Sequence, residues 1–302
     1  MKKEFNCQVT EIITGTYKDI HCFSIDDSKN IDSGVVTSFG EEWQKFHDFD
    51  DAEIDRLGKM YFDILDENMV NHSSYVLDVG CGTARWTKYL ADKVNFIEAI
   101  DPSDAILTAD KLLGGIKNVR LSKASTDTIP FADETFDFVM SIGVLHHIPD
   151  TQKAMIDCVK KTKIGGYFYV YLYYNLENKG FVFRFLLKIV TSIRKVISSL
   201  PTKIKKMACD FIAVFIYMPI ILLGRVIKVV GFPSVASKIP LNIYQNQSFY
   251  IIRNDALDRF GTSLEQRFSK YEVQCMMEKA GLTEIVIAET LPYWHAVGKR
   301  TH

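Results

Sequence analysis

The spacing of hydrophobic residues changes along the chain, and each change predicts a different kind of element. Residues 1–38 predict an irregular or weakly stranded lead-in, whereas the helical spacing within 39–71 predicts two helices. From residue 75 onwards, short apolar runs alternate with helical segments. The predicted strands are 75–79, 95–101, 119–125, 136–143 and 167–174, and the helices between them are 86–93, 103–113 and 151–161, the last stopped by Gly165-Gly166. Such alternation predicts a parallel sheet covered on both faces.

The alternation stops after residue 175 and resumes near the end of the chain. A helix over 270–280 and strands over 284–289 and 294–299 are predicted there, and Pro292 between the strands favours an antiparallel pair. We therefore divide the chain into a lead-in with cap helices (1–72), a core (73–175), a helical insertion (176–262) and the C-terminal part of the core (263–302).

The strongest chemical signal is VLDVGCGTARWT, residues 76–87, in which a strand runs into a glycine turn and then into a helix. Gly80 and Gly82 let the backbone pass close to a ligand, and the helix behind them presents free N–H groups. Asp101 ends the second strand, 19 residues after Gly82. A carboxylate at this position binds a ribose in doubly wound sheets, although Asp101 is also placed to cap the following helix.

Four motifs occur in a fixed order: VLDVGCGTARWT, AIDPSDAIL, IPFADETFDFVMSIGVLHHIPD and KIGGYFYV. In this order and spacing they resemble the motifs of class I S-adenosylmethionine (SAM)-dependent methyltransferases of the type 11 kind. The resemblance is strongest over 74–174 and returns over 268–299. It implies an α/β, Rossmann-like, seven-stranded sheet with an antiparallel last strand, here carrying a helical insertion after the fifth strand.

The resemblance also implies which residues bind SAM. Asp78 would orient the glycine turn or meet the amino group, Asp101 would bind the ribose, and Cys81 would only pack within the turn. Many relatives have Asp where Ser125 stands beside the adenine, so Asp127 is an alternative contact. The implied cofactor-binding set is Asp78, Gly80, Cys81, Gly82, Asp101, Pro102, Ser103, Ser125, Thr126, Asp127, Ser141 and Gly143, of which Ser141 and Gly143 would line the transfer site.

His146 and His147 follow the fourth strand, at the edge where ligands bind. Either is a candidate general base, and a structural role is the alternative. Phe39 and Trp43 would roof the cofactor or pack on the sheet. The charged segment 253–268 is a solvated loop or a site for an anionic acceptor. The candidate acceptor residues are Phe39, Trp43, Tyr244, Arg253, Arg259, Arg267, Tyr293 and Trp294. Alternation along the last strand predicts that only one of Trp294 and the adjacent His295 points inward.

The insertion has an unusual composition for a chain whose net charge is -1. Residues 176–238 hold eleven Lys and Arg but only Glu177 and Asp210. The uncharged run Phe211–Gly224 has 14 residues, fewer than the roughly 20 of a spanning helix, and Pro219 would kink it. Three interpretations of 181–232 stay open: a lid over the acceptor pocket, a monotopic membrane contact that reaches a lipid-linked substrate, and a nucleic-acid surface.

Six scattered cysteines without a CxxC pair predict neither a zinc site nor disulfides, and they suit a reducing cytoplasm. The N-terminal residues lack the apolar core of a signal peptide. We expect a cytoplasmic enzyme, with membrane association as an open alternative. It would move a methyl group from SAM to an oxygen or nitrogen of a small-molecule or lipid/glycan-linked acceptor. The alternatives are a tRNA uridine-modification methyltransferase and a non-catalytic SAM-binding protein.

Overall fold

The computed structural model describes residues 2–25, 30–43, 50–177, 180–245 and 249–302, and the chain divides into two compact units. Unit 1 comprises Met1–Asn178 and Leu264–His302, and unit 2 comprises Lys179–Ser263. The insertion boundaries expected from the sequence, 176 and 262, lie within a few residues of this division. The two units are described separately below.

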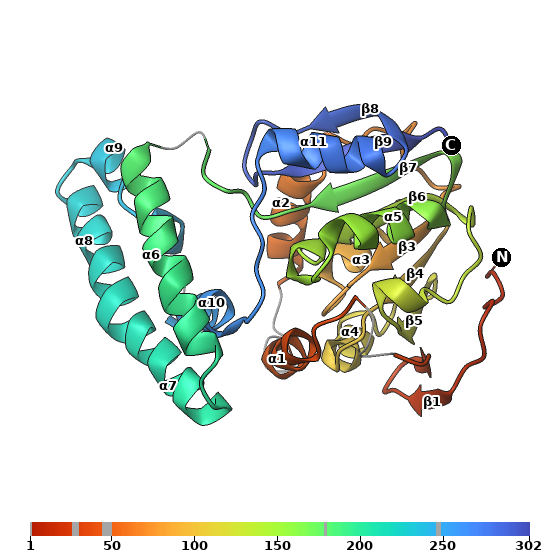
Figure 1. Cartoon of the computed structure of the whole chain (residues 1–302), viewed down its shortest axis with the longest axis horizontal. Coiled ribbons are helices and arrows are strands. Elements are labelled where there is room, and N and C mark those ends of the chain that lie inside the picture. The colour runs from red at the N-terminus through yellow and green to blue at the C-terminus, as the bar shows by residue number, and fades with distance from the viewer. Residues whose placement is uncertain (1, 26–29, 44–49, 178–179, 246–248) are drawn as a thin grey trace. The chain divides into compact units, whose positions relative to one another are not determined.

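Unit 1 is built on one sheet with the strand order β1-β2-β5-β4-β3-β6-β7-β9-β8 (Figure 1). Neighbouring strands from β2 to β7 run parallel, whereas β9 is antiparallel to both β7 and β8. The strands are β1 (Glu11–Thr14), β2 (Asp19–Cys22), β3 (Tyr75–Val79), β4 (Phe96–Ile100), β5 (Val119–Lys123), β6 (Phe136–Ile142), β7 (Thr162–Tyr171), β8 (Leu282–Ile287) and β9 (His295–Arg300). The described sheet therefore has nine strands, not the expected seven, because the lead-in adds a hairpin.

A buried carboxylate explains why the lead-in forms strands. Asp110, inside α4 (Ala105–Leu112), accepts backbone N–H bonds from Tyr17 at 3.2 Å and Lys18 at 2.8 Å. These bonds hold the turn between β1 and β2 and so place β2 beside β5. The local sequence pattern around Lys18 does not reveal that its partner, Asp110, lies 92 positions away.

Helices cover both faces of the sheet, and two apolar clusters fill the space between. Leu77 and Val79 lie in one cluster with residues of α5 (Thr151–Lys161) and α11 (Lys270–Lys279), whereas Val76 lies in the other with residues of α3 (Arg85–Leu90) and α4. This alternation along β3 is expected of a strand buried on both faces. The other helices of unit 1 are α1 (Ser33–Trp43), α2 (Asp51–Tyr61), α3 (Arg85–Leu90), α5 (Thr151–Lys161), α11 (Lys270–Lys279) and the short η1 (Thr126–Thr128) and η2 (Leu145–His147).

One expected boundary is wrong. Gly165 and Gly166 do not separate α5 from the next strand, since β7 begins at Thr162, directly after the helix. Gly165 instead lies inside β7 with φ of +83°, where the pairing of β6 with β7 shifts register between Phe136 and Phe138. The glycine pair thus accommodates a strand irregularity.

Unit 2 is helical. Its elements are α6 (Phe181–Ser198), α7 (Thr202–Ile212), the π-helical η3 (Ala213–Tyr217), α8 (Met218–Val229), α9 (Pro233–Ala236), η4 (Asn242–Tyr244) and α10 (Phe249–Gly261). The segments α7, η3 and α8 follow one another without a break, with Pro219 in the first turn of α8. Figure 1 draws α7 and α8 as parts of one continuous helix. Among the described residues, this helix, Lys203–Val229, is the one segment long and apolar enough to cross a membrane by length and composition. The uncharged run Phe211–Gly224 thus lies within a longer continuous helix, in which the π-helical turn directly precedes α8.

Candidate functional site

The carboxylate of Asp101 lies at the carboxyl edge of the sheet, directly after β4. One of its oxygens accepts from Gly82 N at 2.8 Å, and the other accepts from the backbone N and the hydroxyl of Ser103, at 2.8 and 2.6 Å. Asp101 therefore ties the glycine turn after β3 to the turn that contains Pro102 after β4. Its side chain is buried, and burial raises its pKa.

The glycine turn leaves space where a ligand would lie. Gly82 has φ of +55°, and a Cβ added there would meet no atom within 4 Å. Gly80, with φ of +77°, is crowded on its other side, because an added Cβ would lie 2.5 Å from Val144. A backbone N–H turn that is open beside a carboxylate fits the ribose and methionine parts of SAM.

Asp78, at the end of β3, supplies a second buried carboxylate beneath the turn. It accepts a hydrogen bond of 2.6 Å from Thr87 of α3. Burial raises the pKa of Asp78 to about 7, partly opposed by the Thr87 bond and assisted by the nearby charge of Asp101. Two carboxylates in one buried place create a negative potential that suits a cationic amino group.

Two residues expected at the site have mainly structural contacts. The Ser141 hydroxyl is fully buried and donates to Val79 O at 3.0 Å, so it links β6 to β3 rather than lining an open site. Cys81 is buried within the turn, and burial raises the pKa of its thiol, which agrees with a packing role. Gly143, with φ of +80°, lies at the end of β6, and an added Cβ would touch the ring of Tyr171 at 4.0 Å.

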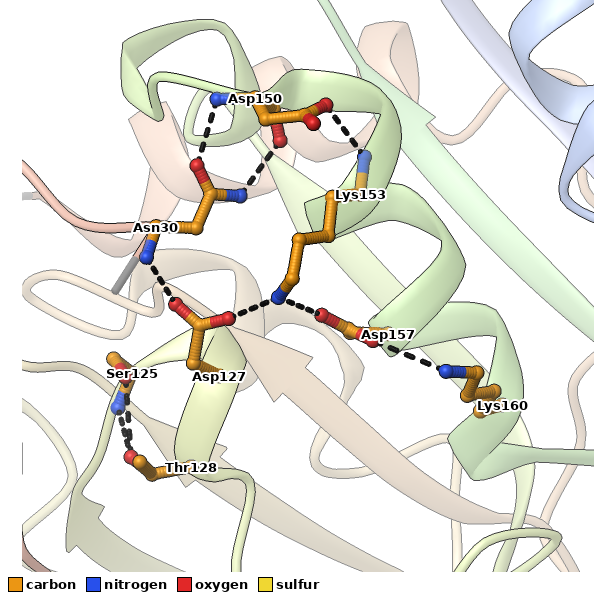
Figure 2. A network of polar contacts seen from close by, with 8 residues as sticks. All are labelled: Asn30, Ser125, Asp127, Thr128, Asp150, Lys153, Asp157 and Lys160. Carbon is orange, nitrogen blue, oxygen red and sulfur yellow. Dashed lines mark hydrogen bonds and ion pairs between the residues drawn. The ribbon is translucent and has the colours of Figure 1, made fainter. Parts of the chain in front are cut away.

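The residues after β5 form a short capped turn. Ser125 is buried, and its backbone N and hydroxyl both meet the hydroxyl of Thr128; Thr126 is buried beside it. Figure 2 shows that the Asp127 carboxylate binds Lys153 of α5 and accepts from the backbone N of Asn30 at 2.8 Å. Both Asp127 oxygens already have partners. A contact with adenine therefore requires Asp127 to bind the adenine amino group in addition to Lys153 and Asn30.

His146 and His147 lie in η2, next to the end of β6. His146 is fully buried and stacks on Tyr173 with ring centroids 3.7 Å apart, and neither ring nitrogen has a hydrogen-bond partner among the described residues. Burial lowers the pKa of His146 well below its usual value, helped by His147 and Arg267, so the ring is neutral at pH 7. The ring of His147 bonds Leu264 O at 2.7 Å, which indicates a positioning role.

Sequence reasoning missed a pair of tyrosines beside these histidines. Tyr61 of α2 and Tyr171 of β7 have ring centroids 5.2 Å apart and share a side-chain hydrogen bond. Burial raises the pKa of both hydroxyls, and the positive charge of Arg85 acts in the opposite direction on both. The helical spacing of Tyr61 and the position of Tyr171 at the end of a strand were the available signals.

Helix α1 lies against the turn that carries Asp101. A Cβ added at Gly40 would lie 3.2 Å from Asp104 N and 3.4 Å from the side chain of Ser103. Phe39 of the same helix packs edge-on against His147, with ring centroids 4.9 Å apart. Phe39 is thus placed between the cofactor turn and η2; the side chain of Trp43 lies outside the described residues.

Arg267, Tyr293 and Trp294 lie near the ends of β7 and β9. Arg267 pairs with Glu265 at 2.7 Å, and its guanidinium lies 5.3 Å from the Tyr173 ring. Trp294 is buried in the α5 and α11 cluster, with Tyr293 packed against it. The adjacent His295 is also buried, on the opposite face, where it meets Asp63 at 2.7 Å. The prediction that only one of Trp294 and His295 points inward is therefore wrong, because helices cover both faces of the sheet.

The other three candidate acceptor residues belong to unit 2. Tyr244 is buried and hydrogen-bonds Asp255, Arg253 pairs with Asp210, and Arg259 lies 3.5 Å from Asp255. These contacts hold the helices of unit 2 together. Segment 253–268 is correspondingly not a single loop, since its first part completes α10 and its last part belongs to unit 1.

Comparison with known proteins identifies the domain. The family model described as "Methyltransferase domain" matches residues 77–170. A ubiquinone/menaquinone biosynthesis C-methyltransferase of Idiomarina loihiensis is 31% identical over 145 residues, which cover 46% of this chain and 57% of that protein. A ubiquinone biosynthesis O-methyltransferase of Hahella chejuensis is 25% identical, over 46% of this chain and 60% of the relative. The chain spans about half the length of the curated relatives it matches.

Among solved structures, a SAM-dependent methyltransferase from Aquifex aeolicus aligns with a TM-score of 0.44 at 17% identity, over 83% of this chain and 97% of the other. The family match covers the glycine turn, Asp101, the strand that leads to His146, and most of β7. The family match and the relatives show a methyltransferase domain over residues 77–170 of the core, as the four motifs predicted.

Proposed function

We propose that the protein transfers a methyl group from SAM to a small-molecule acceptor bound at the carboxyl edge of β6 and β7. The observation that carries this proposal is the bridge that Asp101 makes between Gly82 and Ser103, open on the Gly82 side. Asp101, Asp78 and the glycine turn would hold SAM, which supplies an electrophilic methyl group when bound.

Neighbouring side chains support an acceptor site at the same edge. Gly143 lies beside the Tyr171 ring, and the next residue, Val144, lies beside Gly80 of the glycine turn. The Tyr171 ring in turn contacts the Tyr61 ring. The neutral ring of His146 lies next to them, with Tyr173 stacked on it. In-line displacement requires above all that the acceptor atom be oriented towards the methyl group. Aromatic side chains can hold an acceptor in this orientation and keep water away from it. A neutral imidazole also accepts the proton of a hydroxyl or amine acceptor.

The relatives favour small molecules over RNA. Their names specify methyltransferases of ubiquinone and menaquinone biosynthesis. An acceptor of comparable chemistry, carrying a ring or an apolar chain, suits the aromatic edge formed by Tyr61, Tyr171 and Tyr173. We propose a cytoplasmic location for the reaction, where SAM and reduced cysteines coexist.

The test uses SAM with a labelled methyl group and an extract of the cells that make the protein. Label should enter the lipid or small-molecule fraction, and the Asp101→Ala variant should remove it. Label in RNA would overturn the acceptor class, and SAM binding without any labelled product would identify a non-catalytic SAM-binding protein.

A further inference from the structure

Unit 2 exposes far more apolar surface than unit 1. Of the 27 exposed large hydrophobic side chains recorded among the described residues, 20 belong to this unit of 85 residues. Phe181, Met207 and Phe215 are 74, 71 and 63% exposed. Proteins that stay in water rarely expose contiguous apolar surface of this extent unless something covers it.

The middle of the long helix Lys203–Val229 is apolar around its circumference, because Phe211–Gly224 contains no charged residue. Cys209, Ile212 and Tyr217 are buried in the core of unit 2, where α10 packs against α7 and η3. Met207, Phe211 and Phe215, spaced four residues apart, are exposed instead. Only 33% of its most apolar 18-residue window is buried. A helix that is hydrophobic all round belongs in a protein core or a membrane, and the packing within unit 2 leaves much of this one uncovered.

The charge of unit 2 indicates which kind of surface covers its exposed apolar side chains. Unit 2 carries thirteen Lys and Arg but three Asp and Glu, whereas the rest of the chain has a net charge of -11. Arg184, Lys188, Lys195, Lys203 and Lys228 are exposed on the same helices as the apolar side chains. Basic residues interspersed with exposed Phe, Leu and Ile are the pattern of a helix that lies in the surface of an anionic bilayer.

The length of the uncharged stretch and one ion pair favour lying in the surface over crossing the bilayer. The uncharged stretch Phe211–Gly224 is about 21 Å long at 1.5 Å per residue, shorter than a hydrocarbon core of roughly 30 Å. Asp210 and Arg253, from α7 and α10, form an ion pair in which both side chains are partly exposed. Such a pair is stable at a headgroup boundary and costly in the middle of a bilayer.

From these observations we infer that unit 2 is a monotopic membrane-binding module, which inserts the exposed sides of α6 and of the helix Lys203–Val229 into an anionic lipid leaflet. It would bring the methyltransferase core to the membrane surface. If the proposed function also holds, the acceptor is amphiphilic, with its reactive group in the headgroup region and its apolar part in the lipid. The binding itself does not depend on that function.

The test is flotation of the whole protein with vesicles of phosphatidylcholine, alone or mixed with phosphatidylglycerol. The protein should float with the mixed vesicles and much less with phosphatidylcholine alone. Phe211→Glu with Phe215→Glu should reduce binding at least tenfold, and so should replacement of Lys188, Lys195, Lys203 and Lys228 by Gln. The matched controls are Tyr271→Glu, at an exposed aromatic on a helix of unit 1, and Lys111→Gln with Lys117→Gln; both should bind like the parent.

SAM binding is measured on every variant to show that unit 1 is folded, and circular dichroism monitors the helices of unit 2. No flotation of the parent with mixed vesicles would overturn the inference. So would a stable dimer that the two Glu substitutions dissociate, because the face would then be covered by a second copy. Binding of the protein to RNA that added vesicles do not displace would overturn the inference as well. A parent that floats but binds no SAM would instead refute the proposed function alone.

Discussion

Asp78 offers a direct test of the SAM site, because a cation bound beside it must change its protonation. The pKa of about 7 caused by burial means that this carboxyl is half protonated at neutral pH. The amino group of SAM favours the ionised carboxylate, so binding must release the proton. SAM affinity should therefore rise with pH through 7 and approach its limit about one pH unit above this pKa.

The size of the effect follows from linkage. If the bound cation moves this pKa well below 5.5, affinity falls about fifteenfold between pH 7 and about pH 5.5. Isothermal titration in two buffers with different ionisation enthalpies measures both the affinity and the released proton. Asp78→Asn has no proton to release, so its weaker binding should be nearly independent of pH over this range. A parent affinity that stays flat, or an equal slope in the Asn variant, would refute the assignment.

The protein without SAM should show the opposite dependence. Because the pKa of Asp78 is higher in the folded chain than in the unfolded chain, folding takes up a proton. The stability from the protonated carboxyl is complete below the ordinary carboxyl pKa and is lost as pH rises through 7. Thermal melts should show Asp78→Asn gaining stability relative to the parent as pH rises from about 5 to about 8.

The remaining predictions concern three positions. Asp101→Ala removes the acceptor of both Gly82 and Ser103 bonds and the ribose contact, so equilibrium dialysis should show SAM affinity reduced at least about a hundredfold; near-normal affinity would disprove the ribose role. Gly80→Ala places a Cβ against Val144 at a positive φ, and urea unfolding should show a loss of about 1–3 kcal/mol. His146→Phe keeps an aromatic ring in its stack but not the base, so transfer to a protonated acceptor should fall about a hundredfold or more with SAM affinity unchanged; an equal rate would show that His146 is structural.

The sequence predicted the local elements of the core well, because the signals there are local. The apolar run of β3 ends at the glycines, and helix α5 was placed over the residues that form it, Thr151–Lys161. For the β1–β2 hairpin the sequence predicts only an irregular or weakly stranded lead-in, since the pairing depends on the distant Asp110. The start of β7 was also missed, because a glycine pair has the same appearance at a helix end and at a strand irregularity.

In the candidate site too, residues close together in the sequence were predictable and contacts between distant residues were not. Asp78, Gly82 and Asp101 belong to one contiguous strand-turn-helix and the strand after it, so motif spacing located them. Tyr61 and Tyr171 are 110 positions apart, and only the folded chain brings them together. The motif places Ser141 at the transfer site, but its position in a motif does not reveal that its hydroxyl donates to Val79 O of β3. Pairwise contacts across the sheet are what the sequence pattern lacks.

The place of β9 in the sheet has a consequence for synthesis and quality control. Tyr167–Tyr171 of β7 pair with His295–Lys299, so one edge of β7 is completed by chain made more than a hundred residues later. Until then, an aromatic, strongly strand-forming segment offers unpaired backbone groups. A nascent or truncated chain that stops before residue 295 therefore presents an unpaired strand edge, and it should be a better substrate for chaperones and proteases than a chain that contains β9.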